Sequence, residues 1–310
     1  HYYFARRYGV AVTDFSIGFG KEIFGFNDKN GTRWKFCLIP LGGYVKFFGD
    51  RNVFSQAEQE ELLKKYSKED QKKLFVTKPL YQRSLIVAGG PLANFILALL
   101  IFTLINIFVG KDFTQPKIEE VTINSPAEKA GLKKNDIIIG INDNKVESIL
   151  EVSTYINTNN ADKLKIMVLR DQKKISLVAI PEITDSKDAL GNSVKKKIIG
   201  IKIGPANNEF NKEKLGPTKA VYYATKEIWF VSKTTIQFVG SMFQGKADTS
   251  QLGGPIKIAK ISGQVMEFGI LAFLSTIAYI SISLGLINLF PIPLLDGGHL
   301  MFYLFEKILG

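Results

Sequence analysis

The stretch LIVAGGPLANFILALLIFTLINIFVG, residues 85–110, decides the fold class of this chain, because it contains no Asp, Glu, Lys or Arg. About 20 apolar residues are enough to cross the hydrocarbon core of a bilayer. The alternative is a buried helix of a soluble core, where charge-free apolar runs beyond about 18 residues are rare. The stretch therefore predicts a transmembrane helix over residues 85–110.

A second apolar window covers residues 269–305 and carries one charged side chain, Asp296. It predicts a further transmembrane segment over residues 269–309, with the same alternative of a buried core helix. The net charge of +11 fits a protein that lies beside anionic lipid, and nothing indicates a nucleic-acid partner. The single cysteine, Cys37, excludes a disulfide framework and a cysteine-type metal site.

The segment before the first window divides into three parts. Residues 1–9 end in two arginines and a glycine, which is typical of a transmembrane helix leaving the membrane. Residues 10–54 read as five short strands with a turn at 27–31, and we expect a β region that lies against the membrane. A small soluble hairpin is the alternative. Residues 55–84 are strongly charged and predict a solvated cytoplasmic helix.

Basic residues fix the expected orientation of the 85–110 helix. Lys72, Lys73, Lys78 and Arg83 precede it, and an excess of Lys and Arg marks the cytoplasmic end of a spanning helix. Residues 5–83 would then face the cytoplasm, and residues 112–265 would face the periplasm or the exterior.

Residues 116–181 alternate short strands with two short helices and predict a compact β-rich domain. Ser125 is expected to cap the first of these helices, with Pro126 in its first position. Residues 182–216 read as a polar, lysine-rich connector with a short strand at Ile198–Ile203. Residues 217–268 predict an amphipathic region lying at the membrane interface, and a third spanning helix is the alternative for its first half.

Asp296 is the strongest candidate for a functional residue. A carboxylate at bilayer depth is costly, and it must be protonated, paired with a cation or bound to metal. His299 follows three residues later, and Asn288, two prolines and two glycines interrupt the surrounding apolar run. Such an interruption is tolerated where the backbone lines a cavity inside the protein. A kinked structural helix with a protonated Asp296 is the alternative to a metal site.

The chain resembles the bacterial site-2 proteases, in the branch of the regulator-of-sigma-E protease. The resemblance rests on an ordered set of motifs that spans almost the whole chain: HYYFARRYGV, FSIGFG, IPLGGYVK, GGPLANF, GGPIKIAK and INLFPIPLLDGGH. Residues 124–143, NSPAEKAGLKKNDIIIGIND, resemble a bacterial PDZ domain. One such domain departs from the tandem pair of the enteric sigma-E protease. The implied fold is a multi-pass α-helical membrane protein with a membrane-associated β-hairpin region and an inserted α+β PDZ-like domain.

The resemblance also implies a zinc enzyme. In that family, two histidines of an HExxH helix and the Asp of an LDG motif hold the metal; His1 aligns with the second histidine and Asp296 with the Asp. The first histidine and the general-base Glu would precede residue 1, so residues 1–310 alone would be inactive. His299 would be structural or support the ligands. Zinc with three protein ligands keeps a position open and lowers the pKa of water to about 7.

The implied activity is cleavage of transmembrane helices of membrane proteins within the bilayer, as in the regulated proteolysis of anti-sigma factors or of signal-peptide remnants. Substrate would be held by Asn288, for which a structural role is equally expected, and by Gly42, Gly43 and Tyr44 of the β region, where an opened substrate adds as a strand. The PDZ-like domain would bind peptide C-termini. The expected location is the bacterial inner membrane, with the active site on the cytoplasmic side and the PDZ-like domain outside. A non-catalytic membrane adaptor is the second reading, and an ion transporter the third.

Overall fold

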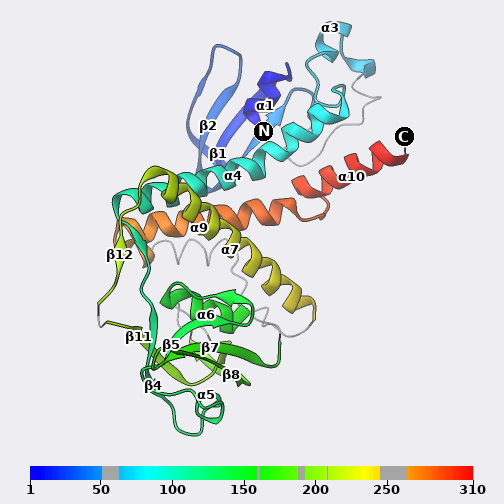
Figure 1. The fold of residues 1–310 in the computed structure, drawn as a ribbon. Coiled ribbons are helices and arrows are strands. Elements are labelled where there is room, and N and C mark those ends of the chain that lie inside the picture. Colours follow the sequence, from blue (N-terminus) through cyan, green and yellow to red (C-terminus); the bar gives the residue numbers. More distant parts are fainter. Residues whose placement is uncertain (51–62, 159–160, 188–192, 208, 245–263, 310) are drawn as a thin grey trace. The chain divides into compact units, whose positions relative to one another are not determined.

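The computed structural model describes residues 1–50, 63–158, 161–187, 193–207, 209–244 and 264–309. The chain divides into two compact units (Figure 1). The first comprises His1–Leu97 and Ile280–Gly310, and the second comprises Ala98–Tyr279. Two helices, α4 (Leu80–Phe108) and α9 (Ile270–Leu289), begin in one unit and end in the other.

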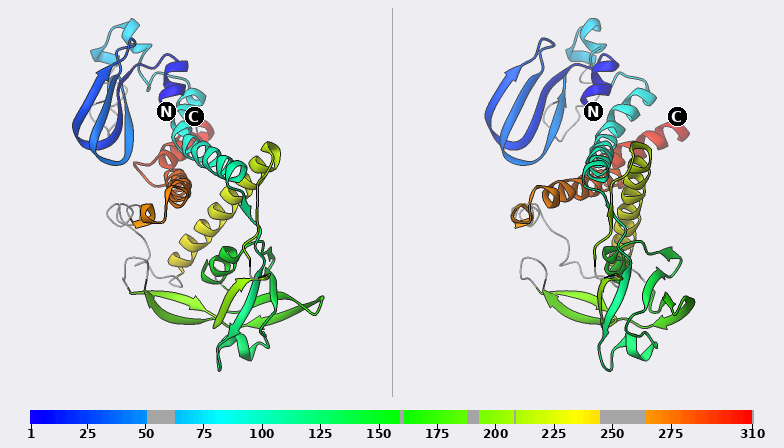
Figure 2. Two further views of the ribbon diagram at one scale, coloured as in Figure 1. Left: turned by 90° about the vertical axis from the view of Figure 1, so that its left-hand side faces the viewer. Right: turned by 60° about the vertical axis from the view of Figure 1, so that its left-hand side comes forward.

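The first unit opens with the short helix α1 (Tyr2–Arg7), which ends in Arg6 and Arg7. Two long strands follow, β1 (Val12–Asn27) and β2 (Arg33–Phe47), and Figure 2 shows them side by side. The expectation of five short strands was therefore wrong, because the glycines bend the strands without ending them. The turn predicted at residues 27–31 joins the two strands.

The register shows that β1 and β2 fold into four paired segments. Residues 12–17 of β1 pair both with residues 43–47 and with residues 33–36 of β2, and residues 22–27 pair with residues 33–37. Within the described chain, segment 43–47 thus pairs with β1 through residues 12–17 and forms one outer side of the sheet. Apolar side chains that are 44–69% exposed crowd this sheet at Ile17, Ile23, Phe24, Phe26 and Leu38.

The charged helix expected over residues 55–84 is not continuous in its described part. Residues 63–65 are helical, helix α3 covers Lys68–Gln71, and α4 begins at Leu80. Between them Leu74 and Phe75 are fully buried, and the Thr77 hydroxyl donates to the carbonyls of Gln71 and Leu74. A proline disfavours the helical conformation at the residue before it, here Lys78, so the helix does not continue up to Pro79. Residues 51–62 lie outside the described part.

Helices α4 and α9 are long and apolar enough to cross a membrane, by length and composition. The interruption expected within segment 269–309 is confirmed. Helix α9 ends at Leu289, and α10 (Asp296–Leu309) follows after a break that contains Pro291 and Pro293. Neither proline can continue the hydrogen bonding of a helix.

The second unit contains a sheet with the strand order β11-β4-β5-β7-β8, and β6 pairs with β5. Its strands and helices run, in chain order, β4 (Pro116–Val121), α5 (Pro126–Lys129), β5 (Ile137–Ile141), β6 (Asn144–Lys145), α6 (Ile149–Thr158), β7 (Leu164–Arg170), β8 (Lys173–Ala179) and β11 (Ile201–Pro205). The predicted cap is confirmed: the Ser125 side chain accepts from the amide of Glu128, and Pro126 opens α5.

The connector expected over residues 182–216 contains structure of its own. It forms the hairpin β9 (Glu182–Lys187) and β10 (Ser193–Ile198), then β11, and then β12 (Lys212–Glu213), which pairs with β3 (Lys111–Asp112). Strand β11 pairs with β4, and Ile199 is 2% exposed within the domain core. The sheet therefore extends beyond residue 181. Its outer strand β11 overlaps the short strand predicted at Ile198–Ile203, whereas the pairing of this strand with β4 was not predicted.

Helix α7 (Pro217–Phe243) is 27 residues long and is not one of the two helices that meet the criteria for a membrane span. Lys226 and Glu227 form ion pairs with residues of the same unit, which explains the charges that interrupt its apolar face. Its placement at a membrane interface stays a prediction. Residues 245–263 lie outside the described part. They belong to the predicted amphipathic region and include the GGPIKIAK motif at residues 253–260.

Candidate metal centre

The structure brings the side chains of His1 and Asp296 together, although 295 positions separate them in the chain. His1 immediately precedes α1, and Asp296 is the first residue of α10. The His1 Nε2 atom lies 3.5 Å from Asp296 Oδ2, and the other ring nitrogen, Nδ1, lies 2.9 Å from the carbonyl oxygen of Ile86. This carbonyl accepts the Nδ1 proton, so the lone pair of Nε2 is directed toward Asp296.

Two glycines of α4 make this approach sterically feasible. A Cβ atom on Gly90 would lie 2.2 Å from His1 Nε2 and 3.0 Å from Asp296 Oδ2. A Cβ atom on Gly89 would lie 2.9 Å from the His1 backbone nitrogen and 2.9 Å from the Phe4 ring. Helix α4 therefore presents bare backbone to the two side chains.

A tight loop delivers Asp296 to this position. Leu294 has a positive φ of 75°, and the amide of Leu295 donates to the carbonyl of Ile292. A Cβ atom on Gly297 would lie 2.2 Å from the Leu289 oxygen, and one on Gly298 would lie 2.3 Å from the Ile292 oxygen. The two glycines of the LDGGH motif are thus required where the loop folds back onto the start of α10.

The pair fits two ligands of one zinc ion. Zinc bonds of about 2.0–2.2 Å in a tetrahedral arrangement place a nitrogen and an oxygen donor about 3.3–3.5 Å apart, in agreement with the 3.5 Å between His1 Nε2 and Asp296 Oδ2. An imidazole nitrogen and a carboxylate oxygen are both ligands that zinc accepts. In the described residues, no group of three His, Cys, Asp or Glu side chains could hold a metal, so this pair supplies two donors and no third.

The other predicted site residues lie elsewhere. Asn288 is half-buried near the end of α9, and no hydrogen bond or ion pair joins it to His1 or Asp296. Gly43 and Tyr44 lie on the outer segment 43–47 of β2, and Gly42 precedes them in the same strand. These assignments stay predictions.

His299 faces along its own helix. Its ring stacks on Tyr303, one turn further along α10, with 6.5 Å between ring centroids. Its amide donates to the carbonyl of Leu295. Nothing in these contacts joins the His299 ring to the pair of His1 and Asp296.

Sequence reasoning missed the contributions of Gly89, Gly90 and the Ile86 carbonyl. The signal was present, since two adjacent glycines followed by Pro91 interrupt an otherwise bulky apolar helix. An isolated glycine in a helix costs about 1 kcal/mol relative to alanine, so a pair in a spanning helix indicates close approach of another group. The sequence does not show which group that is.

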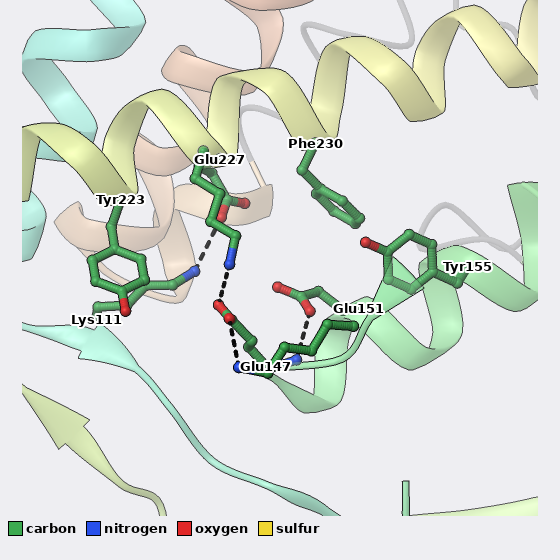
Figure 3. A pocket seen from close by; sticks show the side chains of 9 residues that line it. Lys111, Glu147, Glu151, Tyr155, Tyr223, Glu227 and Phe230 are labelled. Atoms are coloured by element: carbon green, nitrogen blue, oxygen red, sulfur yellow. Dashed lines mark hydrogen bonds and ion pairs between the residues drawn. The ribbon is translucent and has the colours of Figure 1, made fainter. Parts of the chain in front are cut away.

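A second polar cluster lies in the second unit, between helix α7 and the loop that precedes α6 (Figure 3). Glu147 lies 2.7 Å from Lys226, and Glu227 lies 3.1 Å from Lys111. Desolvation favours the neutral form of Glu147, but Lys226 and Lys145 offset it and leave the pKa of this carboxyl below its usual value. Desolvation raises the pKa of the Glu151 carboxyl, and it raises the pKa of Tyr155 to about 12. The cluster is a set of paired charges that ties α7 to α6.

Comparison with known proteins adds an independent line of evidence. The model of the family described as peptidase family M50 matches residues 1–310. A relative from Mesorhizobium japonicum, named "Putative zinc metalloprotease mll0638", is 39% identical over 312 residues, which cover 100% of this chain and 84% of the relative. The protein named "Metalloprotease MmpA" from Caulobacter vibrioides is 33% identical over 329 residues, covering 99% of this chain and 82% of that protein.

Among solved structures, the PDZ domain of an SdrC-like protein from Listeria monocytogenes is similar to part of the chain. It is 22% identical and covers 29% of this chain and 88% of that domain, with a TM-score of 0.24.

Proposed function

Since the chain belongs to peptidase family M50, we propose that it is a zinc endopeptidase that cleaves transmembrane helices of membrane proteins within the bilayer. Relatives named as zinc metalloproteases support the choice of metal. Regulated proteolysis of anti-sigma factors or of signal-peptide remnants is the class of task we expect.

The observation that carries this proposal is the approach of His1 and Asp296 over the bare backbone of Gly90. Asp296 is the only acid in an apolar window of 37 residues, 269–305. Within the described part of the chain, its ion-pair partner is the imidazole of His1, whose other ring nitrogen is held by the Ile86 carbonyl. That arrangement is suited to holding a dication and has no evident use in a structural helix.

The chain's own residues would orient the metal and hold its ligands in place. His1 and Asp296 would be two of its protein ligands, and the Ile86 carbonyl would keep the Nδ1 proton of His1 in place. Zinc, when bound, supplies a Lewis acid that polarises the scissile carbonyl and activates water.

Substrate binding is proposed at segment 43–47 of β2. The backbone donors in the interior of a helical substrate are already hydrogen-bonded within the helix, so the helix must be opened before attack. An opened segment can add as a strand to a sheet edge. Segment 43–47 pairs with β1 through residues 12–17, and it carries Gly43 and Tyr44. In the second unit, the outer strand β11 offers a similar edge for a peptide at the PDZ-like domain.

The membrane arrangement is part of the same proposal. Helices α4 and α9 would span the bacterial inner membrane, and the exposed apolar sheet β1–β2 would contact lipid. The basic residues before α4 support a cytoplasmic position for the sheet and for the metal centre. The domain between α4 and α7 would then lie outside.

The replacement Asp296→Asn tests the metal assignment in the full-length protein. It keeps the size of the side chain but removes the charge that offsets the dication. We expect the variant to insert and fold, because an amide is less costly at membrane depth than a carboxylate. Bound zinc should be lost, and cleavage of a transmembrane model substrate should fall by about three orders of magnitude or more.

The matched control is Glu306→Gln in the same helix. Glu306 is half exposed and pairs with Arg83 at 2.5 Å, so its loss should cost little and leave zinc and cleavage unchanged. Stoichiometric zinc and near-normal cleavage in Asp296→Asn would refute the assignment. A full-length wild-type protein that binds no zinc and cleaves nothing would favour the second candidate, a membrane adaptor.

A further inference from the structure

Asp28, in the turn between β1 and β2, accepts more hydrogen bonds than the turn requires. Its Oδ1 atom accepts from the amides of Asn30 at 2.8 Å and Thr32 at 2.9 Å, which closes the turn. Its Oδ2 atom accepts from the Tyr2 hydroxyl at 3.0 Å and from the Trp34 indole nitrogen at 3.2 Å. The first pair is what an Asp at such a turn ordinarily makes. Of the second pair, the Tyr2 bond joins the turn to α1, and the Trp34 bond joins it to β2.

The chemistry of these bonds favours a rigid attachment. Desolvation acts against ionisation of Asp28, but the donors Thr32, Trp34, Tyr2 and Asn30 outweigh it and lower the pKa of Asp28 to about 2. The carboxylate is therefore charged at neutral pH. Hydrogen bonds to an ionised acceptor are about twice as strong as those between neutral groups.

Aromatic contacts extend this attachment into the sheet. The Tyr2 ring packs edge-on against the rings of Phe15 and Trp34, with 5.5 Å and 5.4 Å between ring centroids. The ring centroids of Phe15 and Trp34 are 4.2 Å apart. Phe15 also pairs in register with Val45, the neighbour of Tyr44. Residue 2 is bonded directly to His1, so a short chain of contacts links the candidate metal ligand to the outer segment 43–47.

We propose that Tyr2 and Asp28 are positioning residues that set the register between segment 43–47 and His1, and thereby select which peptide bond of a bound strand is cleaved. This inference rests on the proposed function. A strand that slips by two residues keeps the same side chains on each face, so pairing alone does not fix which bond reaches the metal. A fixed distance from His1 to the sheet would remove that ambiguity.

The size of the expected effect follows from how steeply cleavage depends on position. A misplacement of about 1 Å costs about 100-fold in rate when the reacting groups are otherwise intact. Loss of one hydrogen bond loosens the sheet without removing it, because the aromatic packing remains. We therefore expect altered cleavage positions together with a moderate loss of rate.

The test compares full-length wild type with Tyr2→Phe, Asp28→Asn and the control Tyr3→Phe. Tyr2→Phe removes only the hydroxyl that Asp28 accepts. Tyr3 is adjacent and 72% exposed, and its ring packs on Phe4 and not on the sheet. For each protein, bound zinc is measured, and the cleaved positions in one transmembrane model substrate are mapped by mass spectrometry.

We expect Tyr2→Phe and Asp28→Asn to keep stoichiometric zinc, to cut at positions spread by two residues, and to lose about 10-fold in kcat with a smaller change in KM. Tyr3→Phe should match wild type. The proposal is overturned if Tyr2→Phe cuts at the wild-type position and rate, or if it loses zinc, since Tyr2 would then act on the ligand itself.

Two further outcomes have defined meanings. If Asp28→Asn fails to fold, Tyr2→Phe decides, because it leaves the turn intact. If the wild type cuts at one position and Tyr2→Phe cuts at the same position with the same rate, this inference is refuted and the proposed function is not. A zinc-loaded wild type that cuts nothing refutes the proposed function, and this inference with it.

Discussion

Gly90 sets how closely two distant side chains approach. Its missing side chain leaves the space that the His1 ring and the Asp296 carboxylate occupy. Glycine normally weakens a helix, and the cost relative to alanine is about 1 kcal/mol. At this position we infer that the cost is offset by access to the candidate metal centre.

Replacement of Gly90 by alanine should lower zinc affinity without unfolding the protein. The added methyl group would lie 2.2 Å from His1 Nε2, so the ring must turn away from Asp296. We expect the dissociation constant for zinc to rise at least about 10-fold, which corresponds to about 1.4 kcal/mol. Competition with a chelating dye measures it in the full-length protein.

Gly240→Ala is the matched control for this replacement. Gly240 also lies inside a helix, α7, but a Cβ atom there would meet nothing within 4 Å. That variant should bind zinc as wild type does and melt at the same or a slightly higher temperature. Equal zinc affinity of Gly90→Ala and wild type would show that Gly90 is not needed for the site.

At the scale of elements, β11 completes the domain that begins at β4. Ile199, just before it, is buried among core residues of β4, β5 and β7, and Ile201 and Ile203 pack against the same core. The pairing of β11 with β4 covers what would otherwise be the edge of the sheet. The hydrophobic core is therefore built in part by a segment that is far along the chain and rich in lysine.

A fragment of residues 114–206 should fold independently, whereas residues 116–181 should not. Burying one isoleucine side chain contributes about 1.5–3 kcal/mol, and a small domain has only about 5 kcal/mol of stability to lose. We expect a cooperative thermal transition for the longer fragment and none for the shorter, measured by circular dichroism. Two fragments with equal melting temperatures would contradict the role of β11.

Two adjacent isoleucines provide the control within the longer fragment. Ile199→Ala should destabilise it by about 2–5 kcal/mol, because the replacement leaves a cavity. Ile198 is 42% exposed, so Ile198→Ala should cost much less. Equal losses at the two positions would indicate that Ile199 is not part of the core.

At the scale of the whole molecule, the proposed function makes a prediction about which side of the membrane each end of α4 faces. From Arg83 and the lysines that precede it, we propose that the start of α4 faces the cytoplasm. A span by α4 would then place the domain built from β4 to β11 on the opposite side. The metal centre would draw on residues from three separate parts of the chain.

Cysteine labelling in spheroplasts tests this arrangement. The native Cys37 is only 8% exposed and should react slowly. A cysteine at Asp143, an exposed turn residue, should react with a membrane-impermeant maleimide in intact spheroplasts. A cysteine at Lys29, exposed in the β1–β2 turn, should react only after the membrane is permeabilised. The reverse pattern would invert the proposed topology.

The sequence by itself determined the apolar helices, the cap at Ser125, the turn at 27–31 and the unusual acid Asp296. These are local signals, since a helix, a cap or a turn is encoded by residues that are neighbours in the chain. The resemblance to a family implied that His1 and Asp296 are ligands of the same metal, which local sequence patterns do not indicate.

Only the tertiary structure decided which residues distant in the chain contact one another. The use of Gly90 as an opening for two side chains, the Tyr2–Asp28 contact and the completion of the sheet by β11 each join residues that are 26 or more positions apart. Single glycines, tyrosines and short lysine-rich strands carry no signal of their distant partners. Their roles arise from packing, because a small side chain has meaning only through the group that fills the space beside it.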